Sequence, residues 1–185
     1  LKLSRGLGDV YKRQVFIDRE AELYLQRKQA VGGWEAARAF VIADKIEESA
    51  LVTSFILQPK DGGDVLDYTP GQYIGIEVKP EGAQYSEIRQ YSLSDKPNGK
   101  QYRISVKREG QGQETQGVVS NHMHDTVAIG DEVSLYAPAG DFMYKERSKP
   151  VTLISAGVGV TPMQSMLEFL NNEQKNDCLL YTSPS

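Results

Sequence analysis

Short β-rich runs at close spacing, between Ala37 and Tyr144, constrain the fold of this chain more than any other feature. Turn sequences such as Asp61-Gly62-Gly63, Thr69-Pro70-Gly71 and Ile129-Gly130-Asp131 separate these runs. Strands this short, divided by turns this frequent, favour a small antiparallel barrel. We therefore expect strands at residues 40–42, 51–57, 73–78, 88–93, 102–106 and 132–136.

The pattern changes at Pro150, where a continuous apolar run is followed by a glycine-rich loop. The run from Val151 to Ser155 predicts a buried strand, and Thr161 and Pro162 suit the cap and first position of a helix. Apolar residues then recur at helical spacing, at Met163, Met166, Leu167 and Leu170. This order predicts the start of an α/β nucleotide-binding domain, whose apolar strand edge we expect to be uncovered.

Domain boundaries follow from these changes of pattern. Residues 15–33 are rich in helix formers and predict the last helix of a missing domain and a hinge. Residues 34–147 are assigned to the barrel, and 148–177 to a nucleotide-binding domain that is truncated after its first helix. Residues 1–14 and 178–185 resemble translated linker sequence, so we expect both segments to lie outside the domains.

Charge and apolar content argue against several kinds of partner. The 21 basic and 25 acidic residues give a net charge of −4, without a basic stripe, which disfavours nucleic acid and anionic membranes. Apolar runs fall short of the about 20 residues of a membrane-spanning helix. The single cysteine, Cys178, cannot form an intrachain disulfide, which fits a cytoplasmic protein.

The segment Arg89-Gln90-Tyr91-Ser92 carries the side chains best suited to a flavin nucleotide. A guanidinium can contact a pyrophosphate with two hydrogen bonds, and the Tyr91 ring offers a flat face to an isoalloxazine. The Ser92 hydroxyl can donate to the flavin edge near N5. Read alone, such a segment is more often an exposed strand with alternating faces.

Two further segments strengthen this interpretation because they occur in a fixed order around the first. Pro70-Gly71-Gln72-Tyr73 precedes it, and a segment that begins at Gly117 follows it. Gly117 lets the backbone approach a diphosphate, and a short helix from Ser120 would present its N-terminal amides to an anion. The expected cofactor contacts of the barrel are Tyr73, Arg89, Gln90, Tyr91, Ser92, Gly117, Val119 and Ser120.

The glycine-rich loop after Ser155 is a candidate NAD(P)H site. It departs from the GxGxxG fingerprint because Pro162 stands in place of the third glycine. Two glycines before a helix suit a pyrophosphate or a nicotinamide ribose, although an ordinary tight turn explains the motif alone equally well. The expected contacts are Gly157, Val158, Gly159, Val160, Thr161 and Pro162.

Three other motifs have simpler explanations. His122, His124 and Asp125 could be metal ligands, but residues two apart on a helix point in different directions, so we interpret them as surface residues. Asp61 to Asp64 lacks the remaining ligands of a calcium loop and is better explained by a hairpin turn. Ala137 to Phe142 is either a linker between domains or a border of the nicotinamide pocket.

The order of these motifs resembles the ferredoxin-reductase superfamily, and longer stretches resemble the flavohemoglobins. The stretches are VFIDREAELY, GGWEAARAF, YTPGQYIGIEVKPEG, EIRQYSLSDKPNGKQYRISVKREG, VSNHMHDTVAIGDEVSLYAPAGDF and PVTLISAGVGVTPMQSML. The resemblance implies an all-β antiparallel flavin-binding barrel, the truncated start of an α/β nucleotide-binding domain, and a short remnant of an N-terminal globin helix.

The same resemblance implies a function and its cofactors. In flavohemoglobins, electrons from NAD(P)H pass through FAD to a heme b in the globin domain, where bound dioxygen oxidises nitric oxide to nitrate. The globin chemistry would lie in the missing segment, and no catalytic residue is expected in this chain because the flavin accepts the hydride. Two alternatives stay open: a stand-alone FAD-dependent NAD(P)H oxidoreductase that donates to a ferredoxin or oxygenase, and a catalytically inert flavin-binding fragment.

Overall fold

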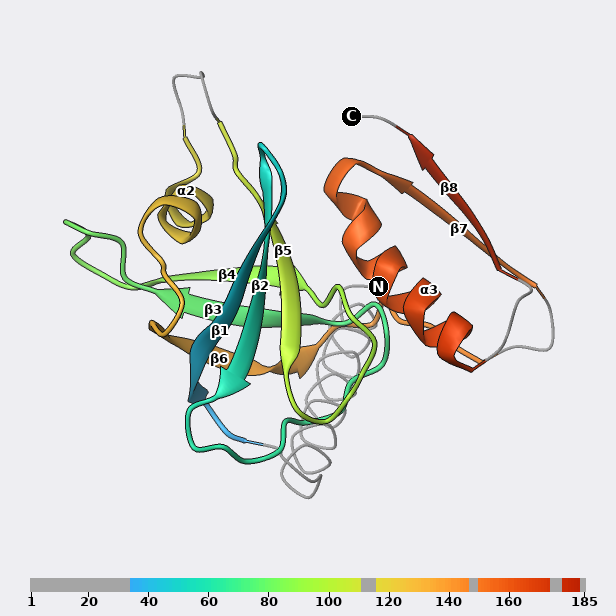
Figure 1. Ribbon diagram of the computed structural model, residues 1–185, viewed down its shortest axis with the longest axis horizontal. Helices are drawn as coiled ribbons and strands as arrows, with labels where there is room; N and C mark the ends of the chain where they lie inside the picture. Colours follow the sequence, from blue (N-terminus) through green and yellow to red (C-terminus); the bar gives the residue numbers. More distant parts are fainter. Residues whose placement is uncertain (1–33, 111–115, 147–149, 174–177, 184–185) are drawn as a thin grey trace, which may run out of the picture.

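The structure is a computed structural model, and it describes residues 34–110, 116–146, 150–173 and 178–183 (Figure 1). The predicted helix and hinge at residues 15–33, and the linker-like residues 1–14, lie outside the described residues. Within the described residues, no helix is both long enough and apolar enough to cross a membrane.

The first part of the chain forms a six-stranded antiparallel sheet in the order β4-β3-β6-β1-β2-β5. An isolated bridge between Leu93 and Ile104 brings together the edges of β4 and β5, which closes the sheet toward a barrel. This confirms the predicted antiparallel fold. The strands are β1 (Ala37–Ser49), β2 (Val52–Pro59), β3 (Tyr73–Val78), β4 (Glu87–Ser92), β5 (Tyr102–Lys107) and β6 (Glu132–Ala139).

Strand β1 is much longer than the predicted run at residues 40–42, because it has 13 residues and a bulge after Ile42. It pairs with β6 only from Ala37 to Val41, and beyond that point it pairs with β2 alone. The outer half is therefore a largely exposed ribbon. Its charged residues hide the apolar alternation that marks a buried strand.

The barrel core is built from alternate residues of the strands. In β5, Tyr102, Ile104 and Val106 are buried, whereas Ser105 and Lys107 point the other way. The ring of Tyr102 stacks on Phe40 with centroids 5.8 Å apart. Helix α2 (Val118–Asp125) lies beside the sheet, between β5 and β6 in sequence, and contributes buried Val119 and Met123 (Figure 1).

The second part of the chain is a strand–helix–strand unit. Strand β7 (Val151–Ala156) leads through a 3₁₀ turn, η1 (Gly157–Gly159), into α3 (Val160–Asn172). Strand β8 (Cys178–Ser183) then pairs with β7 in parallel. This pairing differs from two expectations, because it places linker-like residues beside β7 and covers one edge of that strand.

The start of α3 corrects the predicted cap. The helix begins at Val160 with Gly159 as its N-cap, so Thr161 is the second helical residue and Pro162 the third. The Thr161 hydroxyl donates instead to the Val158 carbonyl at 2.9 Å. The 3₁₀ turn starts at Gly157, where φ is 54°, so the chain is already helical before Thr161. Thr161 therefore lies inside the helix and not at its N-cap position. Proline is tolerated at the third position because first-turn amides have no partner within the helix.

Candidate functional site

A cavity of about 580 Å³ brings together four separate segments of the sequence. It lies where β4, β5, the first turn of α2 and the loop before α3 meet. From the set of expected cofactor contacts it is lined by Arg89, Gln90, Tyr91, Ser92, Gly117, Val119, Ser120, Val158, Gly159, Thr161 and Pro162. The two halves of the sequence prediction, barrel and glycine-rich loop, therefore share one site.

Arg89 lies on the edge strand β4, and its side chain is 51% exposed. Its Nη1 donates to Glu87 Oε2 at 3.0 Å and to the Ile88 carbonyl at 2.8 Å. Residues two apart on a strand share a face, which explains the pairing with Glu87. An ion pair this exposed is weak, so a phosphate in the cavity can compete with Glu87 for the guanidinium.

Tyr91 is half-buried and packs against the barrel core, opposite Ile74 in the register of β3 and β4. Burial raises the pKa of its phenol to about 12, with a smaller contribution from the Glu109 carboxylate. The hydroxyl is therefore protonated at neutral pH. Tyr91 offers the cavity an aromatic ring and one hydrogen-bond donor.

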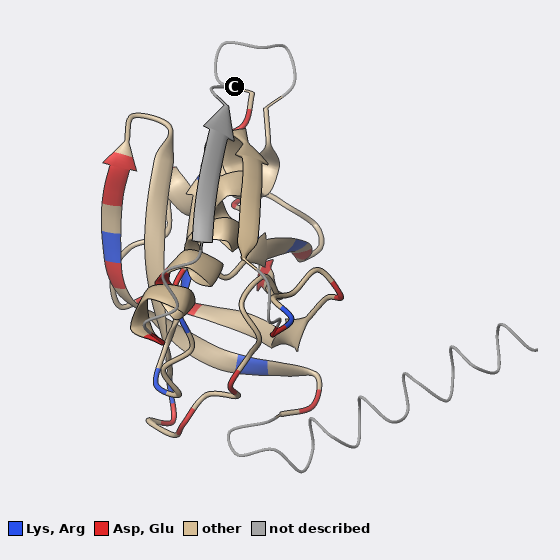
Figure 2. Ribbon diagram, turned by 90° about the vertical axis from the view of Figure 1, so that its right-hand side faces the viewer, with Lys and Arg blue, Asp and Glu red and all other residues tan. Residues whose placement is uncertain are grey.

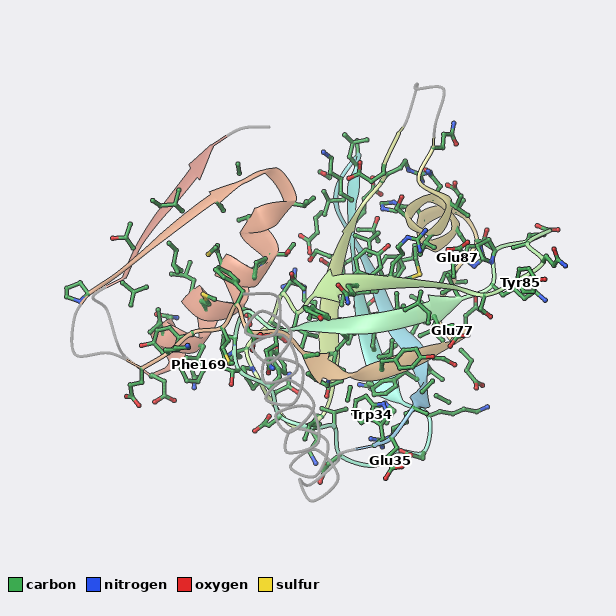
Figure 3. The ribbon with its side chains drawn as sticks, turned by 180° about the vertical axis from the view of Figure 1, so that it is seen from behind. Trp34, Glu35, Glu77, Tyr85, Glu87 and Phe169 are labelled. Atoms are coloured by element: carbon green, nitrogen blue, oxygen red, sulfur yellow. The ribbon has the colours of Figure 1, made fainter. Side chains whose placement is uncertain are left out.

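Tyr73 is separated from the other predicted contacts. It pairs with Ser92 across β3 and β4, but it lines a neighbouring cavity of about 340 Å³ together with Trp34 and Tyr136. Its ring lies so close to Gly140 that a Cβ there would come within 2.9 Å of it. Gln90 lines both cavities and connects them. Figure 3 shows Trp34 on the barrel, apart from Phe169 of α3.

Gly117 is the N-cap of α2, which begins at Val118, two residues before the predicted helix start at Ser120. Within the described part of the chain, no side chain caps this helix end, so its first-turn amides are open toward the cavity. Its φ of −69° is ordinary for any residue. The glycine is required by packing instead, since a Cβ would overlap Ser120 Oγ and come within 2.8 Å of Glu109 Cβ.

The glycine-rich loop contributes part of its predicted set. Val158, Gly159, Thr161 and Pro162 line the cavity, and Val158 is 47% exposed. Gly157 and Val160 are absent from that lining, and both act in forming the turn and the helix start.

Sequence reasoning missed several residues of the cavity wall. They are Ser105, Lys107, Glu109, Gln116 and Val118. The alternation of β5 was the signal for the first two, because burial of Tyr102, Ile104 and Val106 turns Ser105 and Lys107 to the opposite face.

His124 departs from its interpretation as a surface residue. Its Nε2 lies 2.9 Å from the Val106 carbonyl and its Nδ1 lies 3.2 Å from Thr53 Oγ1. Burial lowers the pKa of its ring, as do the nearby cations Arg108 and Lys45. In the described ranges, no group of three or more His, Cys, Asp or Glu side chains is placed to hold a metal ion.

The two remaining motifs are explained by local structure. Asp61 accepts hydrogen bonds from the Gly63 amide and from Arg38 Nη2, at 2.9 and 2.6 Å, within a turn where Gly62 has φ 69°. The segment from Ala137 continues β6 to Ala139 and then turns at Gly140, where φ is 110°. Ala137 and Ala139 line the smaller cavity with Tyr73.

Comparisons with known proteins match both parts of the chain. The family model of the oxidoreductase FAD-binding domain matches residues 39–144. A flavohemoprotein of Vibrio cholerae is 64% identical over 163 residues, which cover 88% of this chain and 41% of the relative. The chain thus spans about two-fifths of the length of that curated relative.

Two solved structures are similar as well. The flavohem-like FAD/NAD binding domain of nitric oxide dioxygenase from Vibrio cholerae has a TM-score of 0.80 at 58% identity, with 82% of this chain and 64% of that chain covered. Phthalate dioxygenase reductase has a TM-score of 0.66 at 27% identity, with 80% and 43% covered.

Proposed function

The chain belongs to the family of oxidoreductase FAD-binding domains, and from this we propose that it is the reductase part of a flavohemoglobin. The observation that carries the proposal is the single cavity shared by β4, α2 and the loop before α3. The 64% identity to a flavohemoprotein extends over 163 residues, more than the barrel contains, and this supports a flavohemoglobin over other flavin reductases.

We propose that FAD lies in this cavity. The fit rests on a half-exposed guanidinium at Arg89, an aromatic ring at Tyr91, and a helix start that no side chain caps within the described residues. Arg89 and the first-turn amides of α2, at Val119 and Ser120, would bind the diphosphate. When bound, FAD supplies the chemistry that accepts a hydride and releases single electrons.

The residues around the flavin have separate proposed roles. Tyr91 would pack its ring on the isoalloxazine, and its protonated phenol would donate a hydrogen bond. Ser92 would donate to the flavin edge, and Gln90 and Tyr73 would contact the cofactor from the neighbouring cavity. Val158, Gly159, Thr161 and Pro162 face the same cavity from the second unit, where they would border the nicotinamide of NAD(P)H.

The whole protein would be an NAD(P)H-dependent nitric oxide dioxygenase. A globin domain with heme b would receive the electrons and use dioxygen to oxidise nitric oxide to nitrate, which detoxifies it. The names of the similar Vibrio cholerae proteins, a flavohemoprotein and a nitric oxide dioxygenase, support this proposal. The proposed compartment is the cytoplasm, which suits a chain with one cysteine.

A second candidate is a reductase that serves a separate electron acceptor. It is favoured by the likeness to phthalate dioxygenase reductase, which is described as transferring electrons from pyridine nucleotides to a [2Fe-2S] centre. The identity of 27%, against 64% for the flavohemoprotein, makes this the weaker candidate.

Nitric oxide consumption by the full-length natural protein tests the proposal. We expect NAD(P)H to drive stoichiometric conversion of nitric oxide and dioxygen to nitrate, in a preparation that contains FAD and heme. Reduction of ferredoxin or cytochrome c without nitric oxide consumption would support the second candidate. Absence of any NAD(P)H oxidation in the FAD-loaded protein would support an inert flavin-binding protein and contradict both.

A further inference from the structure

Helix α2 is tied to the segment that follows β5 by an arginine that does not line the cavity. Arg108 Nη1 and Nη2 donate to the two carboxylate oxygens of Asp125 at 2.9 and 2.7 Å. Nη1 also donates to Asn121 Oδ1 at 3.2 Å. One guanidinium thus holds two residues of α2, one turn apart.

The contact with Asn121 reaches the start of the helix. Because Oδ1 accepts from Arg108, the amide group of Asn121 is oriented so that Nδ2 donates to the Gly117 carbonyl at 2.8 Å. Nδ2 also donates to the Glu109 carbonyl at 3.0 Å. Arg108 is therefore connected, through one side chain, to the N-cap residue of the helix end that faces the cavity.

The contact with Asp125 supports the other end of the helix. A carboxylate in the last turn is unfavourable beside the negative end of the helix dipole, and Arg108 offsets this charge. An eight-residue helix is also too short to be stable by itself, so its direction depends on tertiary contacts. The pair of Arg108 and Asp125 supplies such contacts from outside the binding site.

We propose that Arg108 is a positioning residue for the FAD diphosphate, which acts through Asn121 and Asp125 on the direction of α2 and does not touch the cofactor. This inference rests on the proposed function, because it concerns the helix end that would bind the diphosphate. Arg108 follows β5 directly, and Lys107 and Glu109 on either side of it line the cavity while Arg108 itself does not.

Titrations of the full 185-residue chain with FAD and with riboflavin test this inference. Riboflavin has the isoalloxazine and no phosphate, so it reports on the site without the diphosphate. We expect Arg108→Gln and Asp125→Asn each to raise the Kd of FAD about tenfold, because a displaced α2 loses about one charge-assisted hydrogen bond to the diphosphate. The Kd of riboflavin is expected to stay unchanged. The double variant is expected to match Arg108→Gln, because the pair of Arg108 and Asp125 is already lost in that variant.

Two further variants complete the design. Asp61→Asn removes a bidentate arginine–carboxylate pair of the same type, with Arg38 at 2.6 and 3.1 Å, and is expected to leave FAD affinity unchanged. Arg108→Lys keeps the charge but has a single donor nitrogen, and it is expected to recover part of the FAD affinity that Arg108→Gln loses.

Four outcomes would overturn the inference. If Arg108→Gln weakens FAD binding and Asp125→Asn does not, the pair of Arg108 and Asp125 does not position α2. If riboflavin affinity falls as much as FAD affinity, the pair supports the fold in general and not the diphosphate helix. If the wild-type chain binds no FAD, the proposed function fails as well, whereas wild-type binding with unaltered variants overturns the positioning role alone.

Discussion

At the scale of single residues, Arg89 and His124 are each held by two hydrogen bonds. Arg89 was expected from its guanidinium, and the structure adds its pairing with Glu87 two residues earlier on the same strand. His124 was interpreted as a surface residue, and instead it connects α2 to β2 and β5. The contacts of His124 depend on how α2 packs against these two strands, which no local pattern in the sequence contains.

The ring of His124 predicts a pH dependence of stability. The Val106 carbonyl can only accept, so Nε2 carries the hydrogen and Nδ1 of the neutral ring accepts from the Thr53 hydroxyl. Burial lowers the pKa of this ring below 6.5, so the folded protein favours the neutral form. Its stabilising contribution is present above the unfolded pKa and is lost as pH falls through the lowered folded value.

Urea unfolding between pH 8 and pH 5 measures this effect. The midpoint of the wild-type chain is expected to fall more steeply on acidification than that of His124→Gln, whose side chain does not titrate. His122→Gln, on the same helix, controls for the replacement of a histidine that lacks these two contacts. Parallel pH profiles for the wild type and His124→Gln would show that the ring is not the source.

At the scale of secondary-structure elements, α2 depends on the close packing of its N-cap residue, Gly117. Gly117→Ala is expected to destabilise the chain by about 1–3 kcal/mol, because the added Cβ meets Ser120 and Glu109 and one of them must move. The same shift would displace the helix start and weaken FAD binding. Gly159→Ala is the comparison for stability, since a Cβ there meets no atom within 4 Å and φ is −60°. Equal unfolding midpoints for the two variants would contradict this account of Gly117.

The elements themselves were largely predictable, with exceptions that have physical reasons. Alternation and turn sequences located all six barrel strands, of which five contain buried residues and β4 contains none. The outer half of β1 escaped notice because it is exposed on both faces. The cap of α3 was misplaced because a 3₁₀ turn precedes the helix, and the role of β8 was missed because its sequence does not continue the pattern of its neighbours.

At the scale of the whole molecule, α3 connects the second unit to the barrel through polar contacts near one loop. Ser165 Oγ donates to the Asp95 carbonyl at 2.5 Å, and Lys96 Nζ donates to Asn172 Oδ1 at 3.0 Å. Glu168 lies 3.9 Å from Arg103 of β5. In Figure 2, acidic and basic residues are interspersed along the ribbon. Ion pairs of this kind therefore form without a large surface region of one charge.

The carboxyl of Glu168 predicts that the packing of α3 on the barrel weakens as pH rises. Burial raises the pKa of its carboxyl above 4.5, and the neighbouring Asp95 acts in the same direction. The folded protein thus favours the protonated form, whose contribution is present below the unfolded pKa and is lost as pH rises through the folded value. Glu168→Gln is therefore expected to unfold at a higher midpoint than the wild type at pH 7, and at a similar midpoint near pH 4.

Thermal or urea unfolding at the two pH values checks this prediction, with Glu132→Gln as a control for the loss of an exposed glutamate that pairs with Lys60. A Glu168→Gln variant that is less stable than the wild type at pH 7 would mean that attraction to Arg103 outweighs burial.

A fluorescence titration of the chain with FAD, repeated with Arg89→Ala, tests most directly whether this cavity is an FAD site with Arg89 at the diphosphate. We expect one FAD per wild-type chain, and a Kd raised about tenfold or more in the variant, because a charge-assisted contact is lost. Lys60→Ala, which removes an exposed cation outside the cavity lining, should bind like the wild type. FAD affinity that is unchanged by Arg89→Ala, or a wild-type chain that binds no FAD, would contradict the account.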